Sequence, residues 1–372
     1  MRIAQLAPVV ESVPPQLYGG TERVIAALIA ELTALGHDVT LYASGDSHTE
    51  ARLLPQVEQA LWKLDHPCSA EAIHTVELAR VLRDAADYDV IHSHLDFFSF
   101  PFGRVSSRPF VHTLHGRLDN PELQPLYEEY ADAPVISISN SQRRPLPGAN
   151  WLATVYNGIQ TERVPVGAGK GGYLAFLGRI SPEKGVDQAI DVALKAGIPL
   201  KIAARMPLEN LDNFWVRADW AYYSEYVKPR LSHPLIEFIG EVDDRGKYDL
   251  LKDAMGLVFP INWPEPFGLV MTESLACGTP VIARRIASTP EIIQDGQTGF
   301  LCDTVDEMVA ACAKVGEIDR LACRQDVEER FSSRGMALGY LDAYRKMIEA
   351  SDQCADSRLP NLSFNWDAAQ RR

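Results

Sequence analysis

The sequence predicts an α/β protein of two similar, doubly wound, Rossmann-like lobes. Its 372 residues suffice for two domains of roughly 100–200 residues each. Short apolar runs rich in β-branched residues alternate with helical patterns along the chain, which is typical of parallel sheets covered by helices. Near the middle, the Gly-rich segment VPVGAGKGG is followed at once by a new strand. We therefore expect a first lobe over 1–163, a linker over 164–171 and a second lobe over 172–349.

The apolar runs define the expected strands. In the first lobe these cover 2–8, 38–44, 89–94, 109–115, 134–139 and 152–157. In the second lobe they cover 173–178, 200–205, 236–242, 256–261 and 280–285.

Two helices are well defined by the sequence. The first spans Thr21–Leu35, with Thr21 as its expected cap and Gly36 at its end. Its apolar stripe has helical spacing and consists of Val24, Leu28, Leu32 and Leu35. The second helix follows Pro266, and Gly278 lies just past its end.

Composition excludes several classes of function. The formal net charge of −14 disfavours nucleic acid as a partner, because most of the surface repels phosphate. No apolar run reaches the roughly 18 residues of a membrane span, and the N-terminus is expected to be a strand rather than a signal peptide. The six cysteines form no C-x-x-C pair, so neither a disulfide framework nor a structural zinc is expected. We expect a cytoplasmic protein, with peripheral membrane contact left open.

The strongest functional motif is PEPFGLVMTE at 264–273, in which seven residues separate Glu265 from Glu273. A Pro-fixed turn is expected to expose Glu265 before a helix begins near Phe267. The free backbone N–H groups at a helix start, helped by the helix dipole, form an anion site that suits a diphosphate. Glu273, about two turns along the helix, can accept hydrogen bonds from ribose hydroxyls. A lone glutamate here would be an ordinary surface residue, but the complete string favours a function.

A second motif, GRISPEKG at 178–185, follows the first strand of the second lobe. Arg179 offers a planar fork and Lys184 a compact charge, and both suit phosphate. Open α/β sheets bind ligands at the carboxyl ends of their strands, which favours function over a solvated turn. The matching place in the first lobe is Tyr18-Gly19-Gly20, where glycine permits close approach to a phosphate. A plain strand-to-helix turn explains those glycines equally well.

Four histidines lie on two expected strands of the first lobe. His92 and His94 are expected on opposite sides of their strand, with His94 at its carboxyl end near the cleft. His115 ends the next strand, so His94 and His115 are candidate site residues, whereas His92 and His112 are expected to be structural. Packing is the expected role of the aromatic cluster of Phe214, Trp215, Trp220, Tyr222, Tyr223 and Tyr226, although an acceptor platform stays open.

In this order the motifs resemble those of the retaining glycosyltransferases of family 4, which have the GT-B architecture. The resemblance extends from Arg2 to about Tyr344 and is best in FLGRISPEKG, FIGEV, FPINWPEPFGLVMTESLACGTPVIA and PEIIQDGQTGFL. It implies two Rossmann-like lobes facing each other across a cleft, with the nucleotide sugar on the second lobe and the acceptor on the first. In this architecture the C-terminal segment, about 350–372, packs back on the first lobe.

The resemblance also implies a role for each motif. Glu265 would lie beside the transferred sugar and His115 would hydrogen-bond it, both as catalytic residues. Arg179 and Lys184 would neutralise the leaving diphosphate in place of a metal, and Glu273 would hold the ribose. Further donor contacts would come from Gly19, Gly20, Gly178, Val242, Phe267, Gly268 and Leu269, and His94 would lie on the acceptor side.

The expected activity is therefore metal-independent, retaining transfer of a hexose such as glucose from a nucleotide diphosphate sugar. UDP is the favoured nucleotide, with GDP and ADP left open, and the acceptor is a small or lipid-linked molecule. A single carboxylate at the reaction point fits attack on the face that the phosphate leaves, rather than the carboxylate pair of a retaining glycosidase. A sugar-nucleotide epimerase and a non-catalytic nucleotide-sugar-binding protein remain alternatives.

Two positions depart from the pattern or are ambiguous. Arg205-Met206 stands where the family commonly has glycine and a small polar residue. Arg205 is expected to contact phosphate or acceptor, or to form a surface ion pair. Glu291 follows Pro290 in the first turn of an expected helix, where capping explains it.

Overall fold

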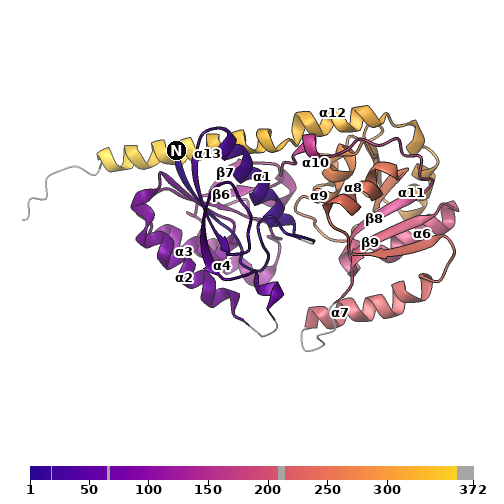
Figure 1. Ribbon diagram of the computed structural model, residues 1–372, viewed down its shortest axis with the longest axis horizontal. Coiled ribbons are helices and arrows are strands. Elements are labelled where there is room, and N and C mark those ends of the chain that lie inside the picture. Colours follow the sequence, from indigo (N-terminus) through magenta and orange to yellow (C-terminus); the bar gives the residue numbers. More distant parts are fainter. Residues whose placement is uncertain (18, 65–67, 208–213, 358–372) are drawn as a thin grey trace, which may run out of the picture.

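The computed structural model describes residues 1–17, 19–64, 68–207 and 214–357, and it confirms two parallel-sheet lobes (Figure 1). In lobe one, seven strands lie in the order β3-β2-β1-β4-β5-β6-β7. In lobe two, six strands lie in the order β10-β9-β8-β11-β12-β13. In each sheet the order reverses beside the first strand of the lobe, and open α/β sheets bind ligands at such a point.

The strands are close to those expected. Lobe one contains β1 (Arg2–Leu6), β2 (Asp38–Ser44), β3 (Arg52–Val57), β4 (Val90–Ser93), β5 (Phe110–Thr113), β6 (Val135–Ser137) and β7 (Trp151–Thr154). Lobe two contains β8 (Leu174–Arg179), β9 (Leu200–Arg205), β10 (Ile236–Gly240), β11 (Gly256–Phe259), β12 (Val281–Arg284) and β13 (Gly299–Cys302). The sequence did not predict β3 and β13. The first is a half-exposed edge strand that contains a proline, and the second is only four residues long.

Helices cover both faces of each sheet. Those in the first part of the chain are α1 (Gly20–Ala34), α2 (Ala70–Arg83), α3 (Phe100–Arg104), α4 (Gln124–Glu129) and α5 (Asn140–Arg143). The others are α6 (Val186–Ala196), α7 (Phe214–Tyr222), α8 (Asp244–Asp253), α9 (Leu269–Ala276), α10 (Thr289–Ile292), α11 (Val305–Cys312), α12 (Arg320–Arg330) and α13 (Ser333–Ser357). Among the described residues, no helix has the length and apolar character that a bilayer crossing requires.

Helix α1 begins one residue earlier than predicted, and Thr21 does not cap it. Its N-cap is Gly19, which makes no side-chain cap hydrogen bond. Gly19 has a φ of 147°, and a Cβ on it would lie 2.8 Å from the Pro15 side chain. Only glycine therefore fits this turn, which brings the chain from β1 into the helix. Tyr18, which the predicted motif includes, lies outside the described residues.

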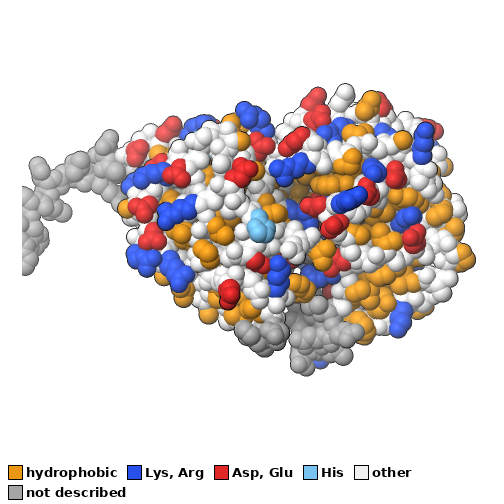
Figure 2. Space-filling view, viewed as in Figure 1, with side chains coloured by type: hydrophobic (Ala, Val, Ile, Leu, Met, Phe, Trp, Pro, Cys, Tyr) orange, Lys and Arg blue, Asp and Glu red, His pale blue; other side chains and the backbone are white. Residues whose placement is uncertain are grey.

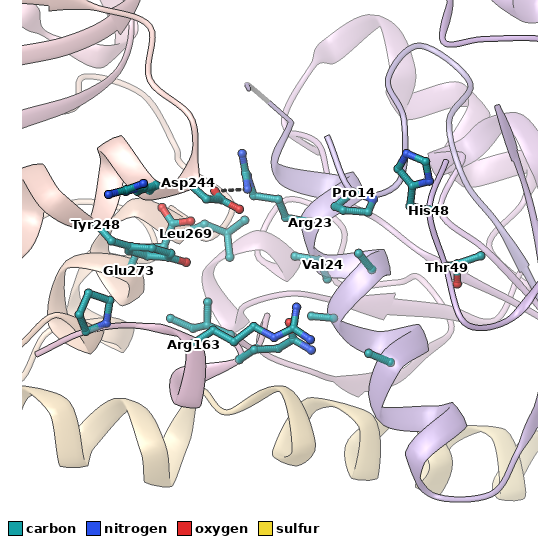
Figure 3. Close-up of a pocket in the computed structure, with 18 of the residues that line it drawn as sticks. Pro14, Arg23, Val24, His48, Thr49, Arg163, Asp244, Tyr248, Leu269 and Glu273 are labelled. Atoms are coloured by element: carbon teal, nitrogen blue, oxygen red, sulfur yellow. Dashed lines mark hydrogen bonds and ion pairs between the residues drawn. The ribbon is translucent and has the colours of Figure 1, made fainter. Parts of the chain in front are cut away.

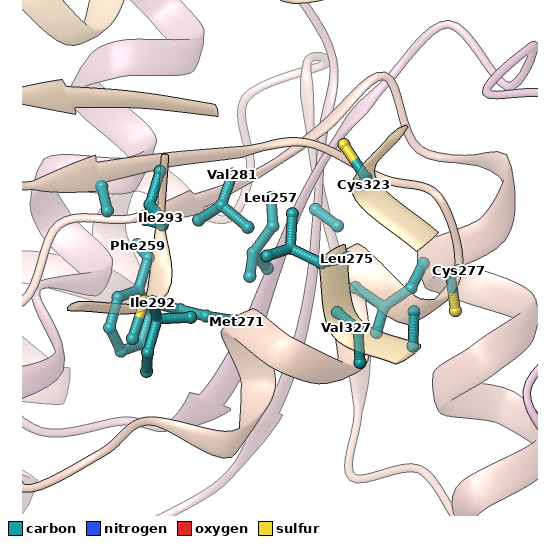
Figure 4. Close-up of a cluster of buried hydrophobic side chains, with 14 of the residues drawn as sticks. Leu257, Phe259, Met271, Leu275, Cys277, Val281, Ile292, Ile293, Cys323 and Val327 are labelled. Atoms are coloured by element: carbon teal, nitrogen blue, oxygen red, sulfur yellow. The ribbon is translucent and has the colours of Figure 1, made fainter. Parts of the chain in front are cut away.

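Helix α9 is held on its sheet by an apolar cluster that is almost entirely buried (Figure 4). Met271 and Leu275 of α9 pack against Leu257 of β11 and Val281 of β12. Val327 of α12 covers the same cluster. The helix that carries the glutamate motif is thus fixed relative to the strands beside it, although it begins at Leu269 rather than near Phe267.

The linker between the lobes is held by two arginines of α12. Arg324 donates to the carbonyl oxygens of Thr161 and Val164, at 2.6 and 2.8 Å. Arg320 donates from Nε to the carbonyl oxygen of Gly167 at 2.8 Å. These bonds hold the backbone between Thr161 and Gly167 against α12, so the linker follows a defined path.

The chain crosses back to lobe one earlier than predicted. Helix α13 begins at Ser333, and the core of lobe one includes its residues Met336, Tyr340 and Tyr344. Residues 333–349 therefore pack with lobe one, whereas the sequence analysis assigned them to lobe two. Of the expected crossing segment, 358–372 lies outside the described residues.

The packing of α13 gives a stability prediction. Leu341 is 2% exposed in the core of lobe one, whereas Leu338 on the same helix is 48% exposed. Leu341→Ala should lower the free energy of unfolding by about 2–5 kcal/mol, because it leaves a cavity in a packed core. Leu338→Ala should change it by less than about 0.5 kcal/mol. Urea titrations of both variants measure the difference, and equal effects would contradict the core position of Leu341.

Candidate active site

A cavity of about 200 Å³ lies between the lobes at the carboxyl ends of their strands. Lobe one contributes the turn into α1, and lobe two contributes the ends of its central strands and the start of α9. The predicted residues that line this cavity are Gly19, Gly20, Gly178, Lys184, Val242, Glu265, Gly268, Leu269 and Glu273. The structure therefore brings most of the predicted donor residues together, although they come from distant parts of the chain.

Glu265 lies in the turn after β11 and is 9% exposed. Its Oε2 atom accepts a hydrogen bond from Lys184 Nζ at 2.5 Å and another from Trp263 Nε1 at 2.9 Å. Lys184 Nζ also lies 4.7 Å from the centre of the Trp263 ring, within cation–π range. The carboxylate is thus held in one orientation beside a cation at the wall of the cavity.

Gly268 sets the turn from Glu265 into α9. Its φ of +83° is a left-handed conformation that favours glycine. An added Cβ would lie 2.8 Å from Met271 Cε and 3.3 Å from Glu265 Cγ. Gly268, Leu269 and Val270 line the cavity, so the start of α9, where backbone N–H groups suit an anion, lies at the cavity wall.

Glu273 is paired with a lysine that the sequence analysis did not identify. Lys247 Nζ lies 2.6 Å from Glu273 Oε1, and the two side chains are 7% and 8% exposed. Lys247 stands on the buried stripe of α8 with Leu250 and Leu251. A lysine at an apolar position of a helical stripe is unusual, and this spacing is the signal by which it could have been found.

A second cavity of about 730 Å³ continues from the first toward the linker (Figure 3). The two cavities share Arg23, Leu269 and Glu273. Arg23 of α1 forms an ion pair with Asp244 of α8, which also accepts from Lys247 at 2.8 Å. A chain of alternating charges therefore runs from lobe one to the Glu273 carboxylate.

Two predicted donor residues do not line the first cavity. Arg179 forms an ion pair with Glu183 and lies 3.8 Å from Asp219. The Phe267 ring is 1% exposed and packs between Tyr156 and Phe331 in the core. Its side chain is therefore structural.

The histidines of lobe one lie close together. His92 and His94 face the same side of the strand, with ring centres 4.1 Å apart, so the expectation of opposite sides was wrong. Residues two apart on a strand share a face. His94 is 2% exposed and bonds to His115, which is partly exposed just past β5. Burial lowers the pKa of His115 to about 4, so the ring is neutral.

His92 and His112 are structural, as expected. His92 bonds to Thr113 and His112 to Ser99, and both rings are fully enclosed. The aromatic cluster packs within lobe two, because the buried Tyr222 donates to Asp187 at 2.6 Å and Trp220 packs on Tyr223. The side chains of Phe214 and Trp215 lie outside the described residues.

Two further contacts join the lobes across the cleft. The Arg205 guanidinium lies 3.6 Å from the centre of the Trp62 ring of lobe one. Glu291 accepts hydrogen bonds from the backbone of Asn140 and Ser141, at 2.8 and 2.6 Å, so it bridges the lobes rather than only capping its own helix. Figure 2 shows the resulting surface, on which Lys, Arg, Asp and Glu side chains are interspersed along the boundary between the lobes.

Two Rossmann-like lobes with cations, carboxylates and a helix start around one shared cavity define a GT-B glycosyltransferase. The model of Glycosyl transferases group 1 matches residues 159–331, and that of Glycosyltransferase Family 4 matches residues 18–163. The chain belongs to the family 4 glycosyltransferases, as the motifs indicated.

Individual relatives agree with this membership. The phosphatidyl-myo-inositol mannosyltransferase of Mycobacterium leprae is 26% identical over 369 residues, covering 90% of this chain and 91% of that protein. A solved glycosyltransferase involved in avilamycin A biosynthesis has a TM-score of 0.71 at 23% identity, covering 94% and 98% of the two chains. Anabaena HepE in complex with UDP and glucose has a TM-score of 0.69 at 19% identity, covering 93% and 100%.

The turn at Gly268 gives a prediction with a matched control. Gly268→Ala should destabilise the protein by at least the roughly 1–2 kcal/mol of a left-handed alanine, and should lower the rate of glycosyl transfer because the new methyl displaces Glu265. Gly296 has a similar φ of +77° with nothing within 4 Å of an added Cβ. Gly296→Ala should therefore lose comparable stability but keep its activity. Thermal unfolding and donor turnover measure both variants, and equal activities would contradict the role of this turn.

Glu22 gives a prediction for pH. Burial, reinforced by the nearby Glu11 carboxylate, raises its pKa from 4.5 to about 7. Folding therefore favours the protonated carboxyl, and this contribution to stability is lost as pH rises through about 7. Glu22→Gln does not ionise, so its stability relative to wild type should rise by about 1–3 kcal/mol between pH 5 and pH 8. Urea titrations at both pH values test this, with Glu128→Gln on the exposed face of α4 as control. A pH-independent difference for Glu22→Gln would contradict the raised pKa.

Proposed function

We propose that this chain transfers a hexosyl group, such as glucose, from a UDP-sugar to a small or lipid-linked acceptor, with retention and without a metal. The observation that carries the proposal is the shared cavity, where Glu265, Lys184 and Glu273 of lobe two meet Gly19 and Gly20 of lobe one. Both lobes contribute to it, as a reaction between a bound donor and a second substrate requires.

The charges around the cavity suit a nucleotide diphosphate. Four cationic side chains line its described walls, namely Arg23, Lys184, Arg205 and Lys247. Three carboxylates accompany them, namely Glu241, Glu265 and Glu273. In this proposal the diphosphate lies between the start of α9 and the glycine turn of lobe one, within reach of Lys184. Glu273 then accepts hydrogen bonds from the ribose, and Val242 lies beside the base.

Donor binding must rearrange the ion pairs of the site. Lys184 is bonded to Glu265, so an incoming diphosphate competes with that carboxylate for the ammonium group. Arg179 must leave Glu183 and Asp219 to reach the diphosphate. Because each cation already has a partner, the site holds its positive charge in place before the donor arrives.

In the proposed reaction the bond between the sugar C1 and the phosphate oxygen breaks, and the acceptor oxygen bonds to C1 from the same face. The proton of the acceptor hydroxyl passes to the leaving phosphate oxygen. Lys184 stabilises the charge that develops on that phosphate, which is the task a metal performs elsewhere. Glu265 positions the sugar and stabilises its positive charge, and His115 hydrogen-bonds the sugar.

Relatives support the choice of donor class. The M. leprae relative is named as a mannosyltransferase, so it transfers a hexose. Anabaena HepE, which shares this fold, has been solved with UDP and glucose. An epimerase or a non-catalytic binding protein would use the same cavity without a second substrate, and the pairing of Lys184 with Glu265 at the reaction point favours transfer.

Calorimetry with UDP-, GDP- and ADP-glucose in the presence of EDTA tests the donor class. The wild type should bind UDP-glucose most tightly. Lys184→Met should weaken that binding about 10–100-fold, because it removes one charge-assisted contact, and Glu273→Gln should weaken it by loss of ribose contacts. NMR should show that the sugar first released in the absence of acceptor is the α anomer.

Lys314→Met is the matched control, because Lys314 is exposed on lobe two away from the cavity. It should bind the donor as the wild type does. Equal affinities in Lys184→Met and Lys314→Met would overturn the proposed diphosphate site. Conversion of the donor to an epimeric sugar nucleotide would overturn transfer in favour of the epimerase alternative.

A further inference from the structure

Seven polar side chains form one continuous, mostly buried hydrogen-bond chain from helix α13 to His115. The chain begins at Tyr340 and Tyr344, which α13 inserts into the core of lobe one. It passes through β1, β4 and β5 and ends at the partly exposed His115 ring, just past the end of β5. Neither packing nor the proposed reaction requires such a chain, since apolar residues would fill the same space without polar groups to satisfy.

The links on the cleft side are short. His115 Nε2 lies 2.8 Å from His94 Nδ1, and His94 Nε2 lies 2.9 Å from Gln5 Oε1. On the helix side, Gln5 Nε2 donates to Tyr344 Oη at 3.0 Å, and Tyr344 Oη lies 2.6 Å from His92 Nδ1. His92 Nε2 then lies 2.7 Å from Thr113 Oγ1, which bonds to Tyr340 Oη at 3.2 Å.

The Gln5 amide determines the direction of every bond on the cleft side. Its Oε1 atom can only accept, so His94 must carry its proton on Nε2. The neutral His94 ring then presents Nδ1 as an acceptor, and His115 must donate to it from Nε2. His115 therefore carries its proton on Nε2, and its Nδ1 keeps a lone pair.

The bond that Thr113 donates to Tyr340 determines which way the Gln5 amide points. Because Thr113 Oγ1 uses its hydrogen on Tyr340, it accepts its other bond from His92 Nε2. His92 Nδ1 then accepts a hydrogen bond from the Tyr344 hydroxyl, whose oxygen accepts from Gln5 Nε2. A reversed amide would require every one of these bonds to reverse together, so the chain acts as a single unit.

The hydrogen-bond chain uses only one of the two ring nitrogens of His115. Among the described residues no partner is recorded for His115 Nδ1, and the ring is partly exposed. Two residues further along the chain, Arg117 lies 5.7 Å over the Trp263 ring, whose N–H group bonds to Glu265. The segment that follows β5 therefore reaches the side chains around the Glu265 carboxylate, although His115 itself is not among the residues that line the cavity.

We propose that Gln5 and Tyr344 are positioning residues that fix His115 as the Nε2–H tautomer, so that its Nδ1 accepts a hydrogen bond from a hydroxyl group of the bound sugar. The part that concerns the sugar rests on the proposed function. Through Tyr344 and Gln5, helix α13 thus determines which nitrogen of His115 can accept a hydrogen bond. His115 acts as a fixed acceptor rather than as an acid.

NMR of protein labelled with ¹⁵N-histidine tests the tautomer directly and needs no substrate. Two-bond proton–nitrogen spectra separate Nε2–H from Nδ1–H rings, and the signals missing in His115→Asn assign His115. The wild type should show His115 as Nε2–H. An Nδ1–H ring would overturn the proposal, whatever the activity of the enzyme.

Tyr344→Phe tests the positioning role, because it removes the hydroxyl that orients Gln5. The His115 signals should change toward a mixture of tautomers, and kcat/KM for the donor should fall about fivefold, the effect of one hydrogen bond. With one donor of a series of monodeoxy UDP-sugars, the wild type and the variant should be equal, because the hydroxyl that Nδ1 binds is missing. Loss of kcat/KM by the same factor with every deoxy donor would indicate a general structural defect and overturn the proposal.

Tyr42→Phe is the matched control. Tyr42 is also buried in lobe one, and its hydroxyl bonds to Tyr88 at 2.9 Å, outside this chain. This variant should keep the His115 tautomer and the wild-type kcat/KM. A wild type that turns over no nucleotide sugar would overturn the proposed function and the sugar contact with it, and the tautomer measurement would still decide whether Gln5 fixes His115.

Discussion

The packing of helix α13 against lobe one is the interaction on which the geometry of the cleft depends. Its residues share one core with Ile3, Val24 and Leu28, so the end of the chain completes the lobe that the beginning starts. Because α13 follows α12 of lobe two with only two residues between them, this core also anchors lobe two. The hydrogen-bond chain that ends at His115 starts from the same helix.

Charge compensation is the second constraint on the site. Glu265 and Glu273 are both largely buried, and a carboxylate removed from water without a partner is strongly destabilising. Lys184 and Lys247 meet this requirement, one for each carboxylate. Two lysine side chains therefore lie beside the proposed diphosphate position. Each is paired with a carboxylate that a more highly charged ligand would displace.

The sequence predicted those parts of the site that local signals encode. The order of strands and helices, the glutamate string and the glycine at 268 could all be read from short segments. The pairing of Lys247 with Glu273 and the link from Tyr344 to Gln5 could not, because each joins segments that lie far apart in the sequence. His92 and His94 were wrongly predicted to face opposite sides, because residues two apart on a strand share a face. Thr21 was wrongly predicted as the helix cap, because the chain enters α1 through a tight turn at Gly19 that has no side-chain cap.

The contacts between the lobes differ in kind from one end of the cleft to the other. Near the linker they are apolar, since Ile138 and Ile159 pack into the core that contains Phe331. Across the cavity they are polar or charged, as in the Arg23–Asp244 ion pair and the Arg205–Trp62 contact. Separating packed apolar surfaces costs free energy, because it exposes them to water. Exposed polar contacts cost little to separate, because water replaces the lost partners. Opening of the cleft about the linker would therefore exchange polar contacts for water and keep the apolar packing.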